Sequence, residues 1–474
     1  MGGLACLLPA ITYNLTLPPD LTWAYQGADG GDLITAATTL GIPHPSGYPT
    51  YVLLGQLFSW LPFGEIAWRF NLFSAVSTIG ACWCLYQSVV HLTQVRIAGV
   101  ISAWLLAFTP LVWSQAIITE VYALNLFCVA WLLWLALKAP SDGKGLGFWL
   151  GLSFGLALGV HLTIVLLVPV LLGRLNNLTW KQWRWVLLGL GLGLLIFAYL
   201  PLRAGRGAIT WGTPDTFSGF VALVSGQIYQ GYVFALPAEQ LVPRFLALLG
   251  YLTETGIISL TLFGLGIWQV WVSHEFGSIT RADLGWAGVT ISAYSLYALG
   301  YRTADSYVYL LPIFVLLSFG AGIGLAQLQR VQPVSIKIVS LILALAILWG
   351  AMQTAQRLSL RQDTVATQFW QAILSQAPAD AVLLTYQDNH TFTLWYAHYA
   401  LQQRPDVSIV DTGLVAFDWY VQDLRKDQAE LAQAASLATQ YAQNQPFVKP
   451  LCAVLSTDQQ DKQWQLKCLD PITK

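Results

Sequence analysis

Two aspartates near the start of the chain are spaced so that they could act together in proton transfer. Asp29 and Asp32 stand in the stretch GADGGDLITAA, which covers residues 27–37. Gly30 and Gly31 allow a tight turn, and a spacing of three places both carboxylates on one side of a helix entry. A carboxylate that faces a cavity can serve as a general base. The pattern is equally typical of a helix N-cap followed by an acidic residue, so both interpretations stay open.

The next irregular stretch brings a titratable side chain close to these aspartates. Residues 41–51 read GIPHPSGYPTY, and their three prolines and two glycines exclude a regular helix. His44 is the titratable group of this rigid loop, which also contains Tyr48. We expect both side chains to contact a polar substrate beside Asp29 and Asp32. The alternative for His44 is a structural role in which it only holds the shape of the loop.

Further charged residues stand where apolar segments end. Glu120 and His161 lie at the ends of such segments, and ionisable groups at that depth are candidate functional residues. Solvation of a helix end is the competing interpretation for Glu120, and a hydrogen-bonded turn is the competing one for His161. Arg203 and Arg206 could bind a phosphate group with bidentate hydrogen bonds, or could anchor the chain at a membrane surface.

A last pair of charged candidates follows another apolar segment. Arg302 and Asp305 could contact substrate, or could simply pair with each other. Acids and arginines gathered at one face of a membrane domain predict an anionic, lipid-linked substrate. The sequence contains no zinc-binding spacing, P-loop, dinucleotide-binding fingerprint or nucleophile elbow.

The composition indicates a membrane protein with a water-soluble appendage. Of 474 residues, 56% are apolar and only 10% are charged, against roughly a quarter in a soluble domain. The net charge of −1 argues against nucleic-acid binding, which needs a basic stripe. Residues 356–474 hold 21 of the 47 charged side chains. We therefore predict a mostly α-helical membrane domain over residues 1–355 and a small α/β domain over residues 356–474.

Eleven apolar segments are candidate membrane spans. A helix needs about 20 apolar residues to cross a bilayer. The candidates are residues 3–17, 70–92, 97–113, 121–138, 146–160, 161–174, 185–202, 246–272, 284–300, 306–326 and 337–355. The fifth and sixth together are too long for one ordinary helix, so the sequence predicts a break near His161.

The positions of Lys and Arg predict the orientation of these spans. With the N-terminus in the cytoplasm, the inside loops carry most of the basic residues: Arg96, Lys138, Lys144, Arg174, Lys181, Arg184, Arg281, Arg330 and Lys337. An odd number of spans then places residues 356–474 outside the cytoplasm. Two long outside segments, 18–69 and 203–245, are rich in Gly, Pro and aromatic residues. Irregular backbone at membrane depth has to line a cavity or be buried in protein, so these segments should cap an outer cavity.

The last 119 residues alternate strand-like and helical patterns. The strand-like runs are residues 381–386, 407–411, 451–456 and 464–468, and the helical ones are 392–403 and 427–443. Such alternation predicts a small parallel or mixed sheet. Asp388 and Asn389 follow the first strand, where α/β folds place ligand loops, or they form an Asx turn. Cys452 and Cys468 could form a disulfide outside the cytoplasm, although spacing alone does not settle the pairing.

Several long motifs resemble a known family. They include GADGGDLITAATTLGIPHPSGYPTYVLLGQLF, AWRFNLFSA, TEVYALN, GLALGVHLT, YLPLRAGRGAITWGTPDTFSGF, SGQIYQGYVF and YQDNHTFTLWYAHYALQQRPDVSIVDTGLV. On these motifs the chain resembles an uncharacterised bacterial membrane family. Its eukaryotic relatives include a protein O-mannosyltransferase that acts on plexin-type receptors. The resemblance covers most of the chain.

The resemblance implies a glycosyltransferase of the GT-C type. Such enzymes have a multi-helix membrane domain, a carboxylate in the first outside loop and a polyprenyl-phosphate sugar as donor, and they usually invert the anomeric centre. Asp29 matches the leading Asp of the family. Asp32 stands where the family more often has Glu, which leaves open which carboxylate is the base.

The residues are consistent with such a reaction. A hydroxyl acceptor needs a base, and the departing lipid phosphate needs positive charge. We expect Arg203 and Arg206 to supply this charge, with Arg302 as the second choice.

We expect no metal ion or other cofactor, and the acceptor can be a protein, a lipid or a glycan. The alternatives are a transporter or flippase of a lipid-linked sugar, which should show repeats and a midplane site, and a non-catalytic assembly subunit.

Overall fold

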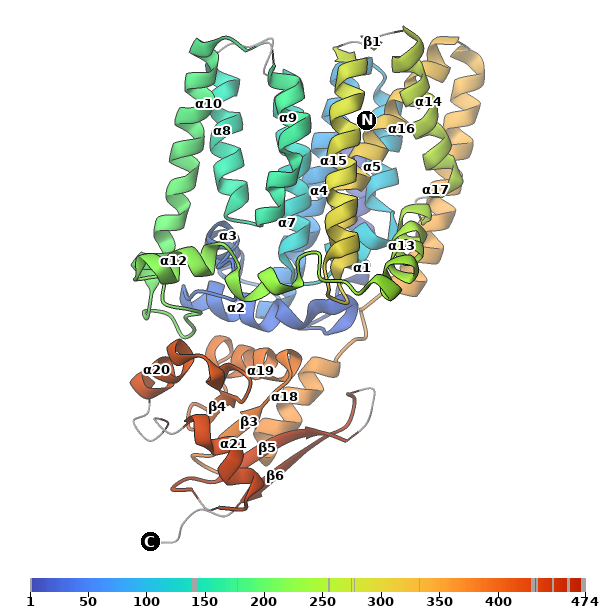
Figure 1. The fold of residues 1–474 in the computed structure, drawn as a ribbon. Helices are drawn as coiled ribbons and strands as arrows, with labels where there is room; N and C mark the ends of the chain where they lie inside the picture. The colour runs from blue at the N-terminus through green and yellow to red at the C-terminus, as the bar shows by residue number, and fades with distance from the viewer. Residues whose placement is uncertain are drawn as a thin grey trace.

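The computed structural model places a helical bundle above a smaller α/β domain, and the chain passes from one to the other through the short segment 359–364 (Figure 1). It describes residues 2–138, 144–176, 178–254, 256–273, 275–276, 278–331, 333–427, 431, 434–445, 447–457 and 461–469.

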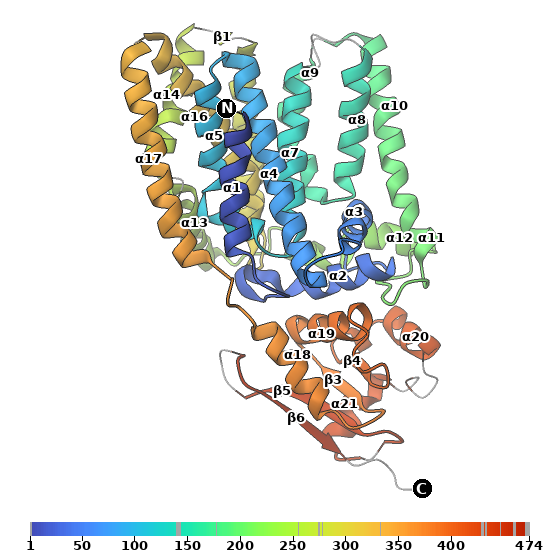
Figure 2. The same cartoon turned by 180° about the vertical axis from the view of Figure 1, so that it is seen from behind.

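The bundle is built from helices, of which the long ones run between its two ends (Figures 1 and 2). Their bounds are α1 Gly2–Thr16, α4 Ile66–Thr93, α5 Arg96–Ala107, α6 Pro110–Ala116, α7 Val121–Lys138, α8 Lys144–Leu158, η3 Leu162–Leu167, α9 Val168–Leu175, α10 Trp180–Leu194, η4 Leu195–Ala198, α11 Tyr199–Arg203, α13 Ala238–Thr253, α14 Ile257–Ser273, α15 Arg281–Gly300, η6 Ser306–Leu310, α16 Leu311–Val331 and α17 Pro333–Leu358. A two-stranded hairpin, β1 Glu275–Phe276 and β2 Ile279–Thr280, joins α14 to α15.

Each predicted span overlaps a helix or a bent pair of helices. By length and apolar composition, five described helices can cross a membrane, or seven if each of two bent pairs forms one span. The figure of eleven spans therefore stays a prediction. The break expected near His161 is present, because α8 ends at Leu158 and η3 begins at Leu162.

Two predicted spans are not single straight helices. The span predicted over residues 97–113 bends by 72° between α5 and α6. Thr109 is extended there (φ −62°, ψ 124°), because the ring of Pro110 disfavours a helical conformation in the preceding residue. The span predicted over residues 246–272 bends by 86° between α13 and α14. Gly256 has a φ of +83° at this bend, a conformation that glycine adopts without strain.

Short elements cover the end of the bundle that faces the α/β domain (Figure 1). They come from the two long segments predicted to cap a cavity: η1 Ala24–Asp29, α2 Gly30–Thr39, α3 Pro49–Ser59, α12 Phe217–Val224 and η5 Gln227–Tyr232. A parallel bridge between Ile42 and Thr210 ties the two segments together. The backbone N–H of Ile42 donates to the carbonyl of Ile209, and the N–H of Trp211 donates to the carbonyl of Ile42.

The α/β domain contains a mixed four-stranded sheet in the order β4-β3-β5-β6. Its elements are α18 Val365–Gln376, β3 Val382–Thr385, α19 Asp388–Trp395, η7 Tyr396–Ala400, β4 Ser408–Asp411, η8 Leu414–Ala416, α20 Asp418–Asp427, α21 Ala434–Ala442, β5 Leu451–Ser456 and β6 Trp464–Leu469. All four predicted strands are present. Of the helix predicted over residues 427–443, α21 supplies the part from Ala434 to Ala442, and Asp427 is the last residue of α20; residues 428–430 and 432–433 lie outside the described residues.

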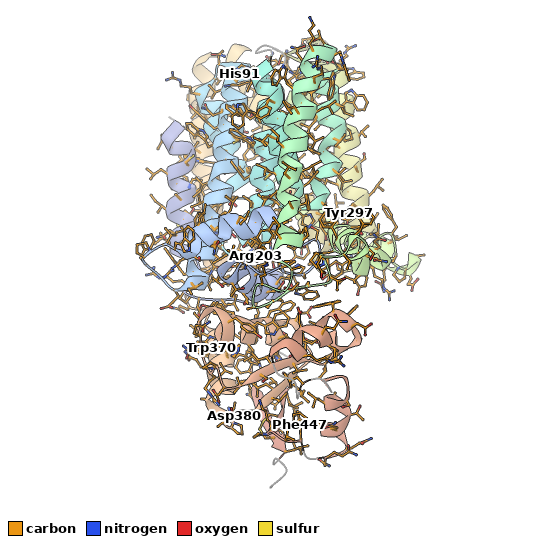
Figure 3. The ribbon with its side chains drawn as sticks, turned by 90° about the vertical axis from the view of Figure 1, so that its left-hand side faces the viewer. His91, Arg203, Tyr297, Trp370, Asp380 and Phe447 are labelled. Atoms are coloured by element: carbon orange, nitrogen blue, oxygen red, sulfur yellow. A yellow bond between two sulfur atoms is a disulfide. The ribbon has the colours of Figure 1, made fainter. Side chains whose placement is uncertain are left out.

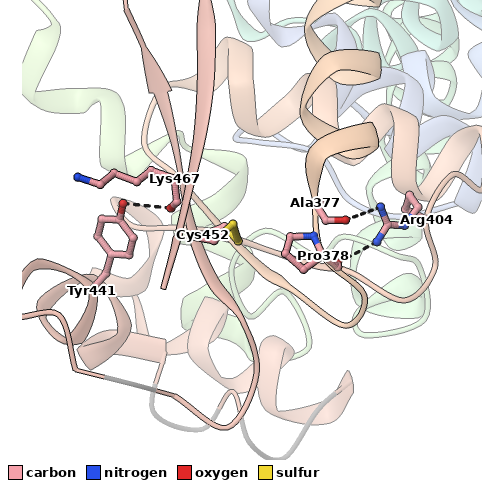
Figure 4. Close-up of a disulfide and its surroundings, with 7 residues drawn as sticks. Ala377, Pro378, Arg404, Tyr441, Cys452 and Lys467 are labelled. Carbon is pink, nitrogen blue, oxygen red and sulfur yellow. Dashed lines mark hydrogen bonds between the residues drawn. A yellow bond between two sulfur atoms is a disulfide. The ribbon is translucent and has the colours of Figure 1, made fainter. Parts of the chain in front are cut away.

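A disulfide joins the two strands at the edge of this sheet. Cys452 on β5 and Cys468 on β6 are directly opposite each other in the antiparallel register and are bonded (Figure 4). The pairing that the sequence left open is thus the one found. On the far side of the sheet, Arg404 donates to the carbonyls of Ala377 and Pro378 and fixes the loop that follows α18.

The bundle and the α/β domain pack directly against each other. A Cβ added to Gly31 on α2 would lie 2.1 Å from the carbonyl oxygen of Phe392 on α19, so glycine permits this close approach. Beside it, Trp23 Nε1 donates to Thr393 Oγ1 at 2.8 Å. The carboxylate of Asp20 is buried and accepts from Tyr396 at 2.6 Å. These contacts hold α19 over the end of the bundle.

Candidate active site

A cavity of about 690 Å³ opens at the end of the bundle that meets the α/β domain. Its lining comes from both cap segments, from the ends of α7 and α15, and from the start of α19. Six of the predicted site residues line it: Asp29, His44, Tyr48, His161, Arg302 and Asp305. The sequence-based prediction that residues 18–69 and 203–245 cap a cavity is therefore confirmed.

Asp29 presents its carboxylate to this cavity. It occupies the N-cap position of α2, but its side chain makes no capping hydrogen bond. The carboxylate keeps 38% of its side-chain area accessible and lies 3.5 Å from Nε2 of His44. Of the two interpretations of Asp29, the geometry thus favours a chemical role over a helix cap.

Asp32 lies behind Asp29 and is fully buried. One carboxylate oxygen accepts from the backbone N–H of His44 at 2.9 Å and contacts its Nδ1 at 2.7 Å. The other accepts from Nε1 of Trp211 at 3.2 Å. Because these three contacts come from both cap segments, Asp32 fixes the imidazole of His44 between the two carboxylates.

The charges of this cluster shift its acid–base properties. Burial raises the pKa of Asp29, the charge of His44 opposes the rise, and the result is a pKa of about 6. Burial by itself lowers the pKa of His44, but Asp29 and Asp32 outweigh that effect and raise it to about 9. Near neutral pH the arrangement is an ionised Asp29 beside an imidazolium.

Aromatic side chains form one continuous wall of the cavity. His161 lies 5.6 Å from Tyr122 and 5.9 Å from Tyr309, between ring centroids, and stacks on Tyr48 at 6.2 Å. Tyr297 continues the wall at 4.9 Å from Tyr309. Rings of this kind offer apolar faces to a sugar or an isoprene unit and hydroxyl groups to polar atoms.

His161 has the structural role that the sequence allowed and also lines the cavity. Its Nδ1 accepts from the backbone N–H of Thr163 at 3.2 Å, which caps η3. The ring therefore contributes shape and hydrogen bonding to the wall of the cavity.

Three further charged side chains line the cavity. Arg302 is exposed and makes no ion pair with Asp305, although both residues are described and both line the cavity. The pairing considered for them in the sequence is thus not found. Asp388 reaches the same cavity from the N-terminal end of α19. Burial raises the pKa of Asp388, as does the charge of Asp411, while His44 lowers it.

Four predicted site residues do not line the cavity: Asp32, described above, and the three that follow. Glu120 is buried at the start of α7, 3% exposed. Arg203 donates from Nε to the carbonyl of Leu40 at 2.8 Å and holds the end of α2. Arg206 is exposed on the next turn. Figure 3 shows Arg203 at the end of the bundle next to the α/β domain, the same end as Tyr297. Arg203 is therefore at the same end as the cavity, but its side chain binds the backbone of the first cap segment.

Asp388 and most of the tyrosines were not among the predicted site residues. Asp388 follows a strand of the α/β domain, and the sequence analysis allowed a ligand loop there, but no sequence signal linked it to Asp29 across some 360 residues of chain. Tyr297 lies in the last turn of α15, and Tyr301 follows the end of that helix four positions later; their rings stack with centroids 5.3 Å apart. That spacing is the signal that could have found them. Among the described residues, no group of three or more His, Cys, Asp or Glu is arranged to hold a metal ion.

Two domain families match the chain. The domain described as the protein O-mannosyl-transferase TMEM260 N-terminal domain matches residues 29–184, and the TMEM260-associated domain 2 matches residues 366–468. The mouse protein O-mannosyl-transferase TMEM260 is 29% identical over 87% of this chain and 62% of its own length. The homologue in Dictyostelium discoideum is 22% identical over 86% of this chain and 57% of its own length. The chain thus spans about three fifths of the length of these relatives.

Solved structures show the same fold. The structure of ArnT from Cupriavidus metallidurans bound to undecaprenyl phosphate covers 96% of this chain and 93% of its own, with a TM-score of 0.60 and 14% identity. An Archaeoglobus fulgidus oligosaccharyltransferase in complex with Zn and sulfate covers 85% of this chain and 62% of its own, with a TM-score of 0.53 and 12% identity. The chain therefore has a fold of the GT-C type.

Proposed function

We propose that this chain, which carries two TMEM260 domains on a GT-C fold, is a membrane glycosyltransferase. It would move a sugar from a polyprenyl-phosphate donor to a hydroxyl group of an acceptor. The observation that carries the proposal is the free carboxylate of Asp29, which faces the cavity and is held beside His44. The names of the relatives favour a mannosyl donor and a protein acceptor.

In the proposed reaction Asp29 is the general base. The acceptor oxygen forms a bond to the anomeric carbon while the bond from that carbon to the phosphate oxygen breaks. Asp29 takes the hydroxyl proton, and the lipid phosphate leaves with the bonding electron pair. One displacement inverts the anomeric centre. Asp32 lacks access to the cavity, so the proposal gives it the role of positioning His44.

Positive charge is needed where the phosphate departs. Arg302 supports this role because it lines the cavity and forms no ion pair among the described residues. The imidazolium of His44 is the second positive group in the cavity. In the proposed mechanism Arg302 takes the place that the sequence analysis gave first to Arg203 and Arg206. The aromatic wall would hold the sugar and the first isoprene units.

We also propose that the cavity opens on the extracytoplasmic side. The basic residues predicted to lie inside are at the helix ends remote from the α/β domain, for example Lys138, Arg174 and Arg281, and such residues favour the cytoplasmic face. A disulfide in the α/β domain is consistent with an oxidising compartment.

The proposed function can be tested with the purified chain in proteoliposomes. We expect a polyprenyl-phosphate mannose carrying a radioactive label to transfer its label to a hydroxyl-containing peptide of a secreted receptor domain. A transporter would move the labelled lipid across the bilayer and leave the peptide unlabelled. The position of the site at one end of the bundle, rather than at its middle, favours the enzyme. Translocation without transfer would refute the proposal.

Arg302 should be needed for use of the lipid donor. A charge-assisted hydrogen bond contributes about 1.5–3 kcal/mol, so Arg302→Gln should lower kcat/KM for the donor about tenfold to a hundredfold. Arg206→Gln is the matched control, since Arg206 is an exposed arginine outside the cavity. Equal losses in the two variants would remove Arg302 from the proposed mechanism.

The rate should depend on pH through the Asp29–His44 pair. Asp29 must be ionised to accept a proton, so kcat/KM should fall as the pH drops through about 6. His44 must be protonated to hold Asp29 and stabilise the phosphate, so the rate should fall again as the pH rises through about 9. A bell-shaped profile is expected, and its two limbs belong to the coupled pair. In His44→Gln the limb near 9 should be absent.

A further inference from the structure

A second cavity, of about 400 Å³, lies at the opposite end of the bundle. Both cavities use α15: Tyr297 lines the first, and Gly288 lines the second. The nine positions between them correspond to about 13 Å along a helix. Ser88 on α4 lines the second cavity one turn before His91, and Figure 3 shows His91 near the end remote from the α/β domain and Tyr297 near the other end.

The second cavity is apolar along its length and charged at one end. Its walls come from α4, α7, α14 and α16, through residues such as Leu133, Ile267 and Phe319. Arg174 and Arg281 line it together with Asp283. Counting these three side chains, the charged end carries a net charge of +1. A hydrocarbon chain with an anionic head has this same distribution of properties.

Arg174 provides the observation that points most directly to a ligand. Its side chain is only 9% exposed and pairs with Asp283 at 3.2 Å, and it also donates to the carbonyl of Ser278 at 2.6 Å. Its Nε is buried and has no hydrogen-bond partner among the described residues. A buried donor on a charged group is costly to leave unpaired. An acceptor oxygen supplied by a bound molecule would remove that cost.

Arg281 adds a second cation near the surface. Its guanidinium lies over the ring of Trp271, 4.9 Å from the centroid, and its Nε donates to the carbonyl of Trp271 at 2.7 Å. These contacts orient the group and, among the described residues, use one of its five N–H donors, so donors are left for a phosphate. Arginine bound in this way is suited to a phosphate oxygen pair.

We propose that this cavity binds an anionic glycerophospholipid from the leaflet at this end of the bundle. One acyl chain lies between the helices, and the phosphate accepts from Arg281 and from Nε of Arg174. The volume lies within the range of about 300–1,000 Å³ of ligand pockets, and basic pockets between membrane helices bind anionic headgroups. The lipid-phosphate donor of the proposed reaction is a different occupant, since its phosphate belongs in the other cavity.

The test uses a glycine whose substitution fills the cavity. A Cβ at Gly288 meets no atom within 4 Å, so Gly288→Leu extends into open space rather than into the backbone. Gly350 on α17 also has nothing within 4 Å and does not line the cavity, so Gly350→Leu is the matched control. The measurement is native mass spectrometry of the full chain from nanodiscs of phosphatidylglycerol, and separately of phosphatidylcholine.

We expect the wild-type chain and Gly350→Leu to retain one phosphatidylglycerol and to release phosphatidylcholine, and Gly288→Leu to retain neither. Arg281→Gln should bind phosphatidylglycerol about fivefold more weakly, which is ~1 kcal/mol for one basic side chain near an anionic headgroup. Because Arg281 is partly exposed, this variant decides the question if Gly288→Leu does not fold. The proposal would be overturned if Gly288→Leu retained as much phosphatidylglycerol as wild type. It would also be overturned if the chain retained both lipids equally, or if it retained only added polyprenyl phosphate.

Discussion

Asp29→Asn should reduce glycosyl transfer by about 10²–10⁴-fold, the usual contribution of a general base. The amide keeps the size of the carboxylate but accepts no proton. Because Asp29 makes no capping bond and stays partly accessible in the cavity, the substitution removes little that supports the fold. We therefore expect thermal unfolding of the detergent-solubilised variant within a few degrees of wild type while turnover of the labelled donor is lost.

A control variant separates this effect from a general loss of negative charge. Asp215 is exposed and lies outside the cavity, so Asp215→Asn should leave turnover unchanged. Binding of the donor lipid to Asp29→Asn should also persist, since the base acts on the acceptor. Turnover of a folded Asp29→Asn variant within about tenfold of wild type would be below the contribution of a general base and would exclude Asp29 from that role.

Local sequence patterns predicted the helices and strands and the segment that carries the two aspartates. Apolar runs gave the helices of the bundle, and alternation gave the strands of the α/β domain. The spacing of Asp29 and Asp32 identified the right segment but could not separate their roles. Their roles depend on contacts that the spacing does not reveal: Asp32 contacts His44 in the following loop and Trp211 in the other cap segment.

Contacts between remote segments account for what the sequence did not show. Gly30 and Gly31 suggested a tight turn, but neither has a positive φ; Gly31 is required by the close approach of α19. Arg203 has the charge of a phosphate ligand, yet three backbone carbonyls, those of Thr39, Leu40 and Arg206, accept its hydrogen bonds. No pattern within one segment distinguishes an arginine that binds a loop from one that binds a substrate.

The position of Asp388 shows why the α/β domain belongs to the site. It lines the cavity from α19, which Trp23 and Asp20 tie to the bundle. A domain that only bound a distant acceptor would not need a carboxylate in the same cavity as Asp29. The α/β domain therefore completes one side of the cavity. Its amino-acid composition indicated a separate soluble domain and did not predict this role.

Asp32→Ala should lower the stability of the folded chain by about 3–5 kcal/mol, the cost of breaking a buried ion pair by removing one partner. The fully buried carboxylate accepts from His44 and Trp211. Its loss leaves the His44 imidazolium with Asp29 at 3.5 Å as its remaining partner. We expect a clear drop in the thermal unfolding midpoint, measured in the same detergent as for Asp29→Asn.

The same substitution should move the alkaline limb of the pH–rate profile. Asp32 raises the pKa of His44 through a hydrogen bond and through its charge, so without it His44 loses its proton at lower pH and the rate falls earlier. Asp32→Glu keeps the charge but adds a methylene to a filled site, at a cost of about 1–3 kcal/mol, and should leave the limb near its original position. If Asp32→Ala is as stable as wild type and its profile is unshifted, Asp32 does not position His44, and the distinction drawn between the two aspartates is wrong.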